Sequence, residues 1–267
     1  MNPADAPGLS ATSEAADLER RFGGLRRLYG DAGYARLRAA RVAVAGLGGV
    51  GSWAVEALAR SGVAELVLID LDHVAESNVN RQIQALTPTL GQAKALALAE
   101  RIAAIHPGCR VHAVEDFVQP DNWPGLLPVP VDLLIDACDQ VRAKSAMAAW
   151  ALAEGRPLVC VGAAGGKRRA ERVDVDDLAS TTHDPLLASL RQRLRKAGAA
   201  PRQGAIGVRC VFSREAVQRP LQAGCDVAEA GSPLACAGYG SSVTVTATFG
   251  MVAAGEAVDQ LLRRPTG

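Results

Sequence analysis

The sequence predicts an α/β fold with a mostly parallel sheet, helices on both faces of the sheet and a smaller C-terminal elaboration. Residues 41–45 form a short apolar run that stops at a glycine cluster, which is typical of a buried parallel strand entering a tight turn. Residues 65–69 and 131–136 are two further apolar runs, and each leads to an aspartate. Such aspartates lie at the sheet edge where ligands bind in open parallel folds.

The glycine cluster predicts a phosphate-binding turn. Gly46, Gly48, Gly49 and Gly51 allow a tight turn and a close approach of phosphate to the backbone. A helix that begins just after them directs its free N–H groups and positive dipole end toward an anion. Asp70 follows at the spacing at which dinucleotide folds place the carboxylate that binds ribose hydroxyls. These features indicate a Rossmann-like nucleotide-binding core.

Polar residues suited to a triphosphate follow the second strand. Arg81 and Lys94 are two cations beyond those that a diphosphate on a glycine turn requires, and they can spread charge while one phosphorus is attacked. The other candidate nucleotide-binding residues in this stretch are Asp72, Asn78, Asn80 and Gln82.

The series GxGGxG, then DxDxVxxSNxNRQ, then a lysine resembles the ATP site of the ubiquitin-activating superfamily, which includes ThiF and MoeB. The resemblance implies that ATP lies on the glycine turn, with Asp70 on the ribose. It also implies that Arg81 and Lys94 hold the phosphates and act in catalysis, while Asn78 and Asn80 orient them.

The resemblance further assigns a metal ligand. The third strand is followed by D-x-x-D, and in the superfamily the second of these aspartates holds the Mg²⁺ that bridges the ATP phosphates, so Asp139 is the expected ligand and a catalytic residue. An alternative for Asp139 is the N-cap of a helix predicted over residues 141–153. Asp136 is expected to support its neighbours.

The N-terminal segment has two parts. Residues 1–17 are rich in Ala, Pro, Ser and Asp and are predicted to form a disordered leader. Residues 18–267 form one domain, with the nucleotide-binding core at about 36–165 and the C-terminal elaboration at about 166–267. In the superfamily an arginine ahead of the first strand reaches the ATP of the partner subunit. Arg21 and Arg27 are the candidates, and this role implies a homodimer; the alternative is a solvated lead-in helix.

Composition excludes several classes of protein. The six cysteines are scattered without a CxxC pair, which indicates reduced thiols in the cytoplasm and argues against a structural zinc. Cys236 lies in a glycine-rich stretch as a mobile nucleophile would, although an inert thiol is favoured. The apolar segment 241–264 is short for a bilayer and threonine-rich, so burial in the protein explains it better than membrane insertion.

The region between residues 167 and 209 is basic. Residues 183–198 have leucines at helical spacing on one face and arginines elsewhere, and such charges are usually a solvated helix face. The alternative is a surface that contacts the phosphate backbone of RNA.

Flanking segments narrow the resemblance to one bacterial branch, the tRNA threonylcarbamoyladenosine dehydratases. These segments are RFGGLRRLYG, HDPLLASLRQRLRK, VRCVFSREA and the terminal VTATFG. The branch implies adenylation of the threonyl carboxylate of the modified adenosine, followed by ring closure with loss of water. It implies ATP and Mg²⁺, with K⁺ or Na⁺ as an open addition, and tRNA as partner.

Three alternatives share part of this pattern. An activator of a sulfur-carrier protein with a Gly-Gly tail shares every ATP residue. A nicotinamide-dependent oxidoreductase explains the glycines and Asp70, but it leaves Arg81, Lys94 and Asp139 without roles. A non-catalytic scaffold in a sulfur relay, partnered by a cysteine desulfurase or a sulfur acceptor, is the third.

Overall fold

The computed structural model describes residues 17–218 and 239–263. Its centre is one seven-stranded sheet with the order β3-β2-β1-β4-β5-β7-β6. All neighbouring strands pair in parallel except β6 and β7, which are antiparallel. The strands are β1 (Arg41–Ala45), β2 (Glu65–Ile69), β3 (Arg110–Val114), β4 (Leu133–Asp136), β5 (Leu158–Val161), β6 (Val173–Asp177) and β7 (Arg209–Ser213). The predicted mostly parallel α/β fold is therefore confirmed.

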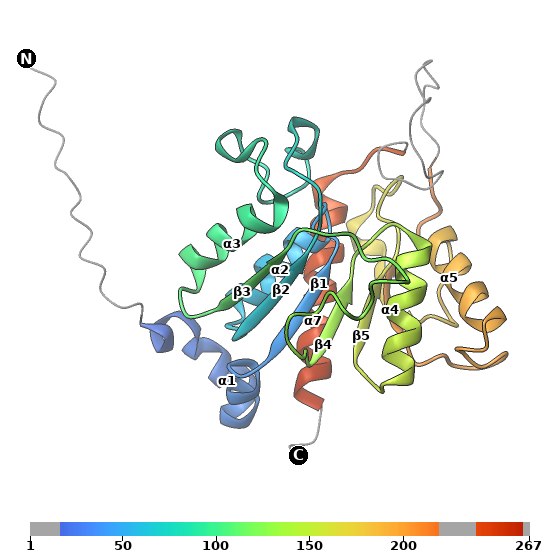
Figure 1. Cartoon of the computed structure of the whole chain (residues 1–267), viewed down its shortest axis with the longest axis horizontal. Coiled ribbons are helices and arrows are strands. Elements are labelled where there is room, and N and C mark those ends of the chain that lie inside the picture. Colours follow the sequence, from blue (N-terminus) through green and yellow to red (C-terminus); the bar gives the residue numbers. More distant parts are fainter. Residues whose placement is uncertain (1–16, 219–238, 264–267) are drawn as a thin grey trace, which may run out of the picture.

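Helices cover both faces of this sheet (Figure 1). Most buried apolar residues of α2, α3 and α7 belong to one core cluster, and most of those of α4 and α5 belong to a second cluster on the other face. The helices are α1 (Leu18–Leu37), α2 (Gly51–Arg60), α3 (Lys94–Ile105), α4 (Val141–Ala153), α5 (Pro185–Lys196) and α7 (Val243–Arg263). Three short 3₁₀ turns, η1 (Glu76–Asn78), η2 (Thr87–Thr89) and η3 (Ala170–Arg172), lie in the connections.

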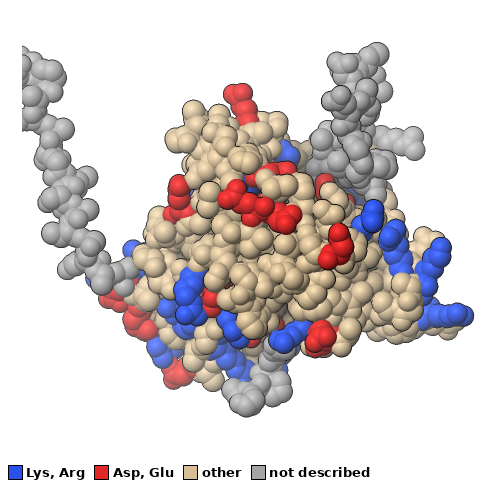
Figure 2. Space-filling view, viewed as in Figure 1, with Lys and Arg blue, Asp and Glu red and all other residues tan. Residues whose placement is uncertain are grey.

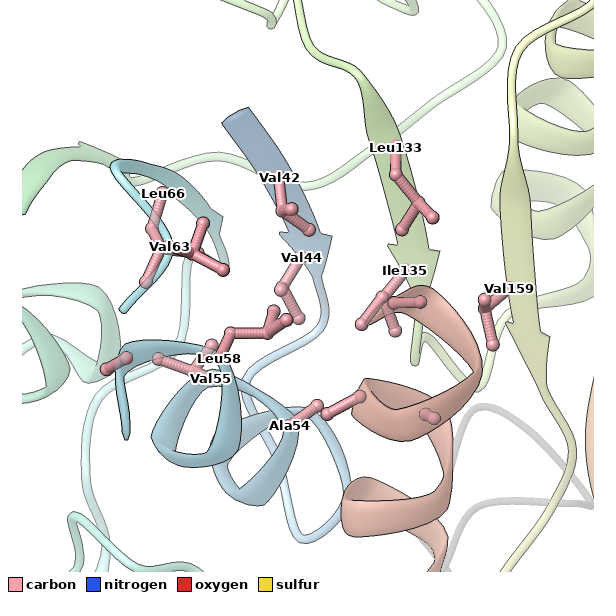
Figure 3. Close-up of a cluster of buried hydrophobic side chains, with 14 of the residues drawn as sticks. Val42, Val44, Ala54, Val55, Leu58, Val63, Leu66, Leu133, Ile135 and Val159 are labelled. Atoms are coloured by element: carbon pink, nitrogen blue, oxygen red, sulfur yellow. The ribbon is translucent and has the colours of Figure 1, made fainter. Parts of the chain in front are cut away.

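Strand β1 is buried on both faces, which explains its continuous apolar run. Val42 and Val44 pack into the cluster with α2 and α7, whereas Ala43 and Ala45 pack into the cluster with α4. Figure 3 shows the valines pointing toward Val55 of α2 beside the neighbouring strand β4. Parallel strands covered by helices on both sides read as near-continuous hydrophobic segments, as this one does.

The last helix, α7, packs lengthwise against α2 and the middle of the sheet. Val245, Phe249, Ala253 and Ala257 are fully buried on its inner face. This burial accounts for the apolar character of the C-terminal segment. Among the helices of residues 17–218 and 239–263, none combines the length and apolarity needed to cross a bilayer.

The edge strand and the first helix have local irregularities. Residues Ala170–Arg172 form the turn η3, and the antiparallel strand β6 starts directly after it, at Val173. Helix α1 is interrupted at Gly30, where φ is 72° and ψ is 173°. The predicted leader and Cys236 lie outside the described residues, apart from Asp17, which caps α1 by accepting a hydrogen bond from the N–H of Arg20.

Candidate active site

One pocket opens at the carboxyl ends of the central strands, where β1, β2, β4 and β5 pass into loops. The predicted site residues that line it are Gly46, Gly48, Gly49, Asp70, Asp72, Arg81, Gln82, Lys94 and Asp139. These residues come from three separate connections of the chain, which follow β1, β2 and β4. The fold therefore brings most of the predicted nucleotide-binding residues together in a single cavity.

The glycine turn is too tight for other residues at two positions. Gly46 has a φ of 85°, and a Cβ there would lie 2.8 Å from the carbonyl of Ala137. A Cβ on Gly51, the first residue of α2, would lie 1.8 Å from the carbonyl oxygen of Gly46. Because no side chain fits, the N-terminus of α2 closes directly onto the end of β1, beside the pocket.

Asp70 organises this turn as well as lining the pocket. Its Oδ2 accepts a hydrogen bond of 2.6 Å from the N–H of Leu47, and its Oδ1 accepts one of 2.9 Å from the N–H of Asp72. Burial raises the pKa of Asp70, although Lys94 and these two backbone donors act in the opposite direction. The carboxylate joins the end of β2 to the glycine turn.

Lys94 is the first residue of α3, and its side chain is almost fully buried. Its Nζ lies 2.6 Å from Oδ2 of Asp72 and 4.0 Å from Oδ1 of Asp70. Asp72 is half exposed, so this ion pair lies at the mouth of the pocket. A bound anion at this position would meet the lysine together with the half-exposed carboxylate of Asp72.

Arg81 is placed by the loop between β2 and α3. Its Nη1 donates to the carbonyl of Ser77 and to Oδ1 of Asn80, and its methylenes lie against Gly49. Asn80 and Asn78 do not line the pocket. Asn80 donates to the carbonyl of Ser241, and Oδ1 of Asn78 accepts from the N–H of Ala75, so both shape the loop that carries Arg81.

The two candidate arginines of α1 differ in their surroundings, and neither lines the pocket of its own chain. The guanidinium of Arg21 donates to the carbonyls of Ala104 and Ile105 at the end of α3. Arg27 is exposed, and its side chain makes no hydrogen bond or ion pair with any residue in the described ranges. The structure thus distinguishes two residues that the sequence left equivalent.

Asp139 lies in the loop between β4 and α4, exposed at the pocket wall. The N-cap of α4 is Gln140, without a side-chain hydrogen bond, so the predicted N-cap role of Asp139 is wrong. Its carboxylate makes no hydrogen bond or ion pair with the part of the chain that the structure describes. Across that same part, no group of three or more His, Cys, Asp or Glu side chains gathers as a metal centre.

Sequence reasoning missed Lys144, a fully buried cation behind the pocket wall. Its Nζ lies 3.2 Å from Oδ1 of Asp136 and donates to the carbonyls of Asp136 and Val161, at 3.3 and 2.6 Å. Oδ1 of Asp136 also accepts from the N–H of Cys138, which confirms that Asp136 supports its neighbours. The available signal was helical spacing, because Lys144 lies three and four residues before the buried Met147 and Ala148.

The opposite wall of the pocket is the loop of residues 162–164 that follows β5. Asp184 holds it, since its Oδ2 accepts from the N–H of Ala163 while its Oδ1 caps α5 through the N–H of Leu187. The side chain of Asp184 leaves no room for a Cβ on Gly162. Helix α5 is therefore joined directly to the pocket, a connection that sequence spacing did not reveal.

The basic region divides into structural and exposed cations. Lys167 is buried and donates to the carbonyls of His183 and Glu215, and Arg191 donates to the carbonyls of Leu178 and Thr181. By contrast, Arg193 and Lys196 of α5 and Arg202 in the following loop are exposed. None of these three side chains has a hydrogen bond or ion pair to another described residue. Figure 2 shows Lys and Arg side chains gathered over the end of the molecule that carries α5.

Comparison with known proteins agrees with this geometry. The tRNA threonylcarbamoyladenosine dehydratase of Escherichia coli (strain K12) is 45% identical over 92% of this chain and 94% of its own length. The enzyme of that name from Haemophilus influenzae is 38% identical over 96% and 99%. The E. coli dehydratase solved in complex with ATP superposes with a TM-score of 0.82 at 43% identity, over 92% of this chain and 96% of that one. The family model of ThiF matches residues 21–267. The chain therefore belongs to the ThiF family.

Proposed function

We propose that this protein catalyses the ATP-dependent cyclisation of threonylcarbamoyladenosine beside the anticodon of tRNA, with loss of water. The observation that carries the proposal is similarity over more than nine tenths of both chains to a dehydratase of that name. The similarity includes the pocket and also the C-terminal strands and helices outside the glycine turn.

The reaction proceeds in two balanced steps. An oxygen of the threonyl carboxylate attacks the α-phosphorus of ATP, and pyrophosphate leaves with the electron pair of the broken P–O bond. The carbamoyl group of the same modification then attacks the activated carbonyl, losing a proton, and AMP leaves. The nucleophile is already attached to the substrate, so ring closure gains the advantage of an intramolecular reaction.

This route requires no protein thiol. Cys138 lines the pocket, but burial raises the pKa of its thiol well above the ordinary value, and the neighbouring Asp136 acts in the same direction. A thiol kept protonated is a poor nucleophile. The chemistry of the pocket therefore favours direct ring closure over a covalent enzyme intermediate.

Different residues of the pocket bind different parts of ATP in this proposal. The glycine turn and the N-terminus of α2 receive the phosphates, and Asp70 lies beside the turn for the ribose. Lys94 exchanges its bond to Asp72 for a phosphate oxygen, and Arg81 approaches the same phosphates from the loop between β2 and α3. Both cations then stabilise the charge that develops when pyrophosphate leaves.

Asp139 is the residue that would hold Mg²⁺. The ion usually binds nucleotides through one or two carboxylates, with water and phosphate oxygens as the other ligands. An exposed carboxylate at the pocket wall without a competing cation in the described ranges fits that requirement. When bound, Mg²⁺ supplies neutralisation of the triphosphate charge. A requirement for K⁺ or Na⁺ is tested in the same assay by exchanging the salt.

The exposed cations of α5 form the tRNA surface in this proposal. Leu186 lines the pocket, and Lys196 lies ten residues further along the helix, which corresponds to about 15 Å at the α-helical rise. Arg193 and Lys196 thus extend outward from the pocket without acidic partners among the described residues. Phosphates that flank the modified nucleotide are the ligands such cations attract.

Two copies of the chain complete the site in this proposal, which also places the enzyme in the cytoplasm with its tRNA substrate. Arg27, exposed near the kink of α1, is the arginine proposed to reach the ATP of the partner subunit. Arg21 has its guanidinium engaged with the end of α3 in its own chain. The residue assigned in trans is therefore Arg27.

The proposal is tested with tRNA that carries threonylcarbamoyladenosine. The purified protein is incubated with ATP, Mg²⁺ and this tRNA, and the tRNA is digested and its nucleosides are weighed. Loss of one water from the modified nucleoside is expected, with AMP formed in equal amount. Lys94→Ala should reduce the rate about 100-fold to 1,000-fold, the usual cost of one transition-state donor.

The control variant is Arg263→Ala, an exposed residue at the far end of α7 that pairs only with Asp259 among the described residues. It should react like the wild type. An unchanged nucleoside mass, with AMP released only when a carrier protein with a Gly-Gly tail is added, would replace the dehydratase proposal by the sulfur-carrier activator.

A further inference from the structure

The ammonium group of Lys144 joins the two walls of the ATP pocket from behind. Val161 is the last residue of β5, and Asp136 is the last residue of β4. Nζ donates to both of their carbonyls, and it forms an ion pair with the carboxylate of Asp136. The loop after β4 carries Asp139, and the loop after β5 supplies residues 162–164 of the pocket. One buried cation thus contacts the start of both loops.

The free-energy cost of burying the Lys144–Asp136 ion pair indicates that Lys144 has a role beyond packing. Lys144 is 0% exposed, and so is Asp136. Removing two charges from water is expensive, and replacing a buried ion pair with apolar side chains of similar size is often neutral or stabilising. The surroundings of Nζ are acceptors, namely two carbonyls, one carboxylate and the sulfur of Cys160 at 3.7 Å. Although burial opposes the charge, the carboxylate of Asp136 raises the pKa of Lys144, so the ammonium stays protonated.

The same network determines where Asp139 can lie. Oδ1 of Asp136, the oxygen that faces Lys144, also accepts a hydrogen bond of 3.1 Å from the N–H of Cys138. Asp139 is the next residue, and the structure gives its own side chain no bond to another described residue. The backbone of this loop is further confined by Gly46, where any Cβ would meet Ala137. Asp139 is therefore positioned through the backbone, and that backbone is held by Asp136 and Lys144.

We propose that Lys144 is a positioning residue for Mg²⁺-dependent ATP binding, acting through Asp136 and the loop that presents Asp139. The inference rests on the proposed function, because it requires that Asp139 holds the metal. Residues behind metal ligands orient them, and their loss typically lowers metal affinity about 10-fold to 100-fold. A purely structural Lys144 would change the stability of the fold without changing how ATP binding depends on Mg²⁺.

The test is equilibrium binding of ATP, measured by calorimetry over a range of Mg²⁺ concentrations and without tRNA. In Lys144→Met the side chain keeps its shape and loses its charge. We expect the Mg²⁺ concentration that half-saturates ATP binding to rise about 10-fold or more, while ATP binding without Mg²⁺ stays close to that of the wild type. Lys144→Arg restores a cation and its donors, so its half-saturating Mg²⁺ concentration should lie between those of Lys144→Met and the wild type.

Two further comparisons separate positioning from stability. Glu56→Gln changes another buried charge, which pairs with Arg60 and Arg101 and does not line the pocket, so it should lower stability and leave the Mg²⁺ dependence unchanged. In an Asp139→Asn background, Lys144→Met should add no further loss, because residues that act through one another are not additive.

Three results would overturn the inference. These are a wild-type Mg²⁺ dependence in a folded Lys144→Met protein, an equal loss of ATP binding with and without Mg²⁺, or full additivity with Asp139→Asn. If Lys144→Met does not fold, Lys144→Gln, whose amide keeps N–H donors without the charge, is measured against the same criteria. Failure of the dehydratase proposal is recognised separately, by an unchanged nucleoside mass in the tRNA assay with wild-type protein that binds ATP normally.

Discussion

Oδ2 of Asp70, at the end of β2, accepts a hydrogen bond of 2.6 Å from the backbone N–H of Leu47 in the glycine turn after β1. The carboxylate expected to bind the ribose therefore also holds the turn expected to bind phosphate. Because its second oxygen accepts from the N–H of Asp72, both oxygens are engaged before any ligand arrives.

Asp70→Asn should destabilise the protein and weaken ATP binding together. The amide places a donor where one of the two N–H groups, buried at Leu47 and part-buried at Asp72, needs an acceptor. An unsatisfied buried group costs about 1–3 kcal/mol. Urea unfolding and ATP calorimetry measure the two effects. The control is Asp72→Asn, whose half-exposed ion pair with Lys94 should contribute about 1 kcal/mol or less. Equal unfolding midpoints for Asp70→Asn and wild type would contradict this account of the turn.

Alanine substitutions at two glycines of α7 should change the stability of the protein in opposite directions. A Cβ on Gly250 would lie 2.5 Å from the carbonyl oxygen of Val50 and 2.7 Å from Cβ of Trp53, so Gly250→Ala should cost about 1–3 kcal/mol through overpacking against α2. A Cβ on Gly255 would have no atom of the described residues within 4 Å, and Gly255→Ala should stabilise the helix by up to about 1 kcal/mol. Thermal unfolding of both variants checks the prediction; a similar shift for both would show that α2 and α7 do not pack this closely.

His106 should make the protein less stable as the pH falls below neutrality. Burial, followed by Arg38 and Arg21, lowers the pKa of this histidine from 6.5 to about 4. Between these values the unfolded chain binds a proton that the folded chain does not, so the free energy of unfolding decreases as the pH falls through this window and is fully present above it. Urea unfolding midpoints at several pH values between 7 and 4 measure how the free energy of unfolding depends on pH.

The variant that tests this assignment is His106→Gln. Its free energy of unfolding should change less with pH than that of the wild type. His112→Gln provides the control, because its ring is part of a half-buried pair with Glu65 at the edge strand β3. A wild-type slope in His106→Gln would assign the pH dependence to other groups.

Arg193→Gln with Lys196→Gln should weaken tRNA binding through the loss of phosphate contacts. Each contact to a duplex contributes about 0.9 to the slope of log affinity against log salt, so removing two should reduce that slope by about 2. ATP binding without tRNA should be unchanged, because neither residue lines the pocket. Filter binding at several salt concentrations measures the slope.

The matched double variant is Arg60→Gln with Arg110→Gln. It removes two cations that pair with buried glutamates, at the end of α2 and on the edge strand β3, away from α5. The two double variants carry the same change in net charge. If both double variants reduced the salt dependence of tRNA binding equally, the effect would come from the overall charge of the protein. The proposal that α5 binds tRNA would then be wrong.

The boundaries of several elements follow from local patterns alone. The strand at Glu65–Ile69 and the helix at Val141–Ala153 have the predicted limits, because burial on both faces and helical spacing both leave a regular record in the chain. The leucines of α5 were expected on one face, and Leu186, Leu187, Leu190 and Leu194 are all buried.

The partners of polar side chains could not be predicted in the same way. Arg21 and Arg27 look equivalent in a glycine-containing helix, and only the position of α3 engages the first of them. Asp139 was considered as the N-cap of the helix at 141–153, yet the residue directly before that helix, Gln140, is its cap and makes no side-chain hydrogen bond there. Such choices depend on groups that are far away in sequence.

The sequence by itself determined that this chain forms a mostly parallel sheet with a turn that only glycine can make, and it predicted nine of the residues that line the pocket beside that turn. These properties follow from local sterics and from periodic burial, which act over a few neighbouring residues. The tertiary structure decided which side chains meet: Lys144 joins β4 to β5, and Asp184 joins α5 to the loop after β5. Those contacts depend on strand order and loop closure over long separations, because a buried charge is stable only where acceptors from distant segments converge on it.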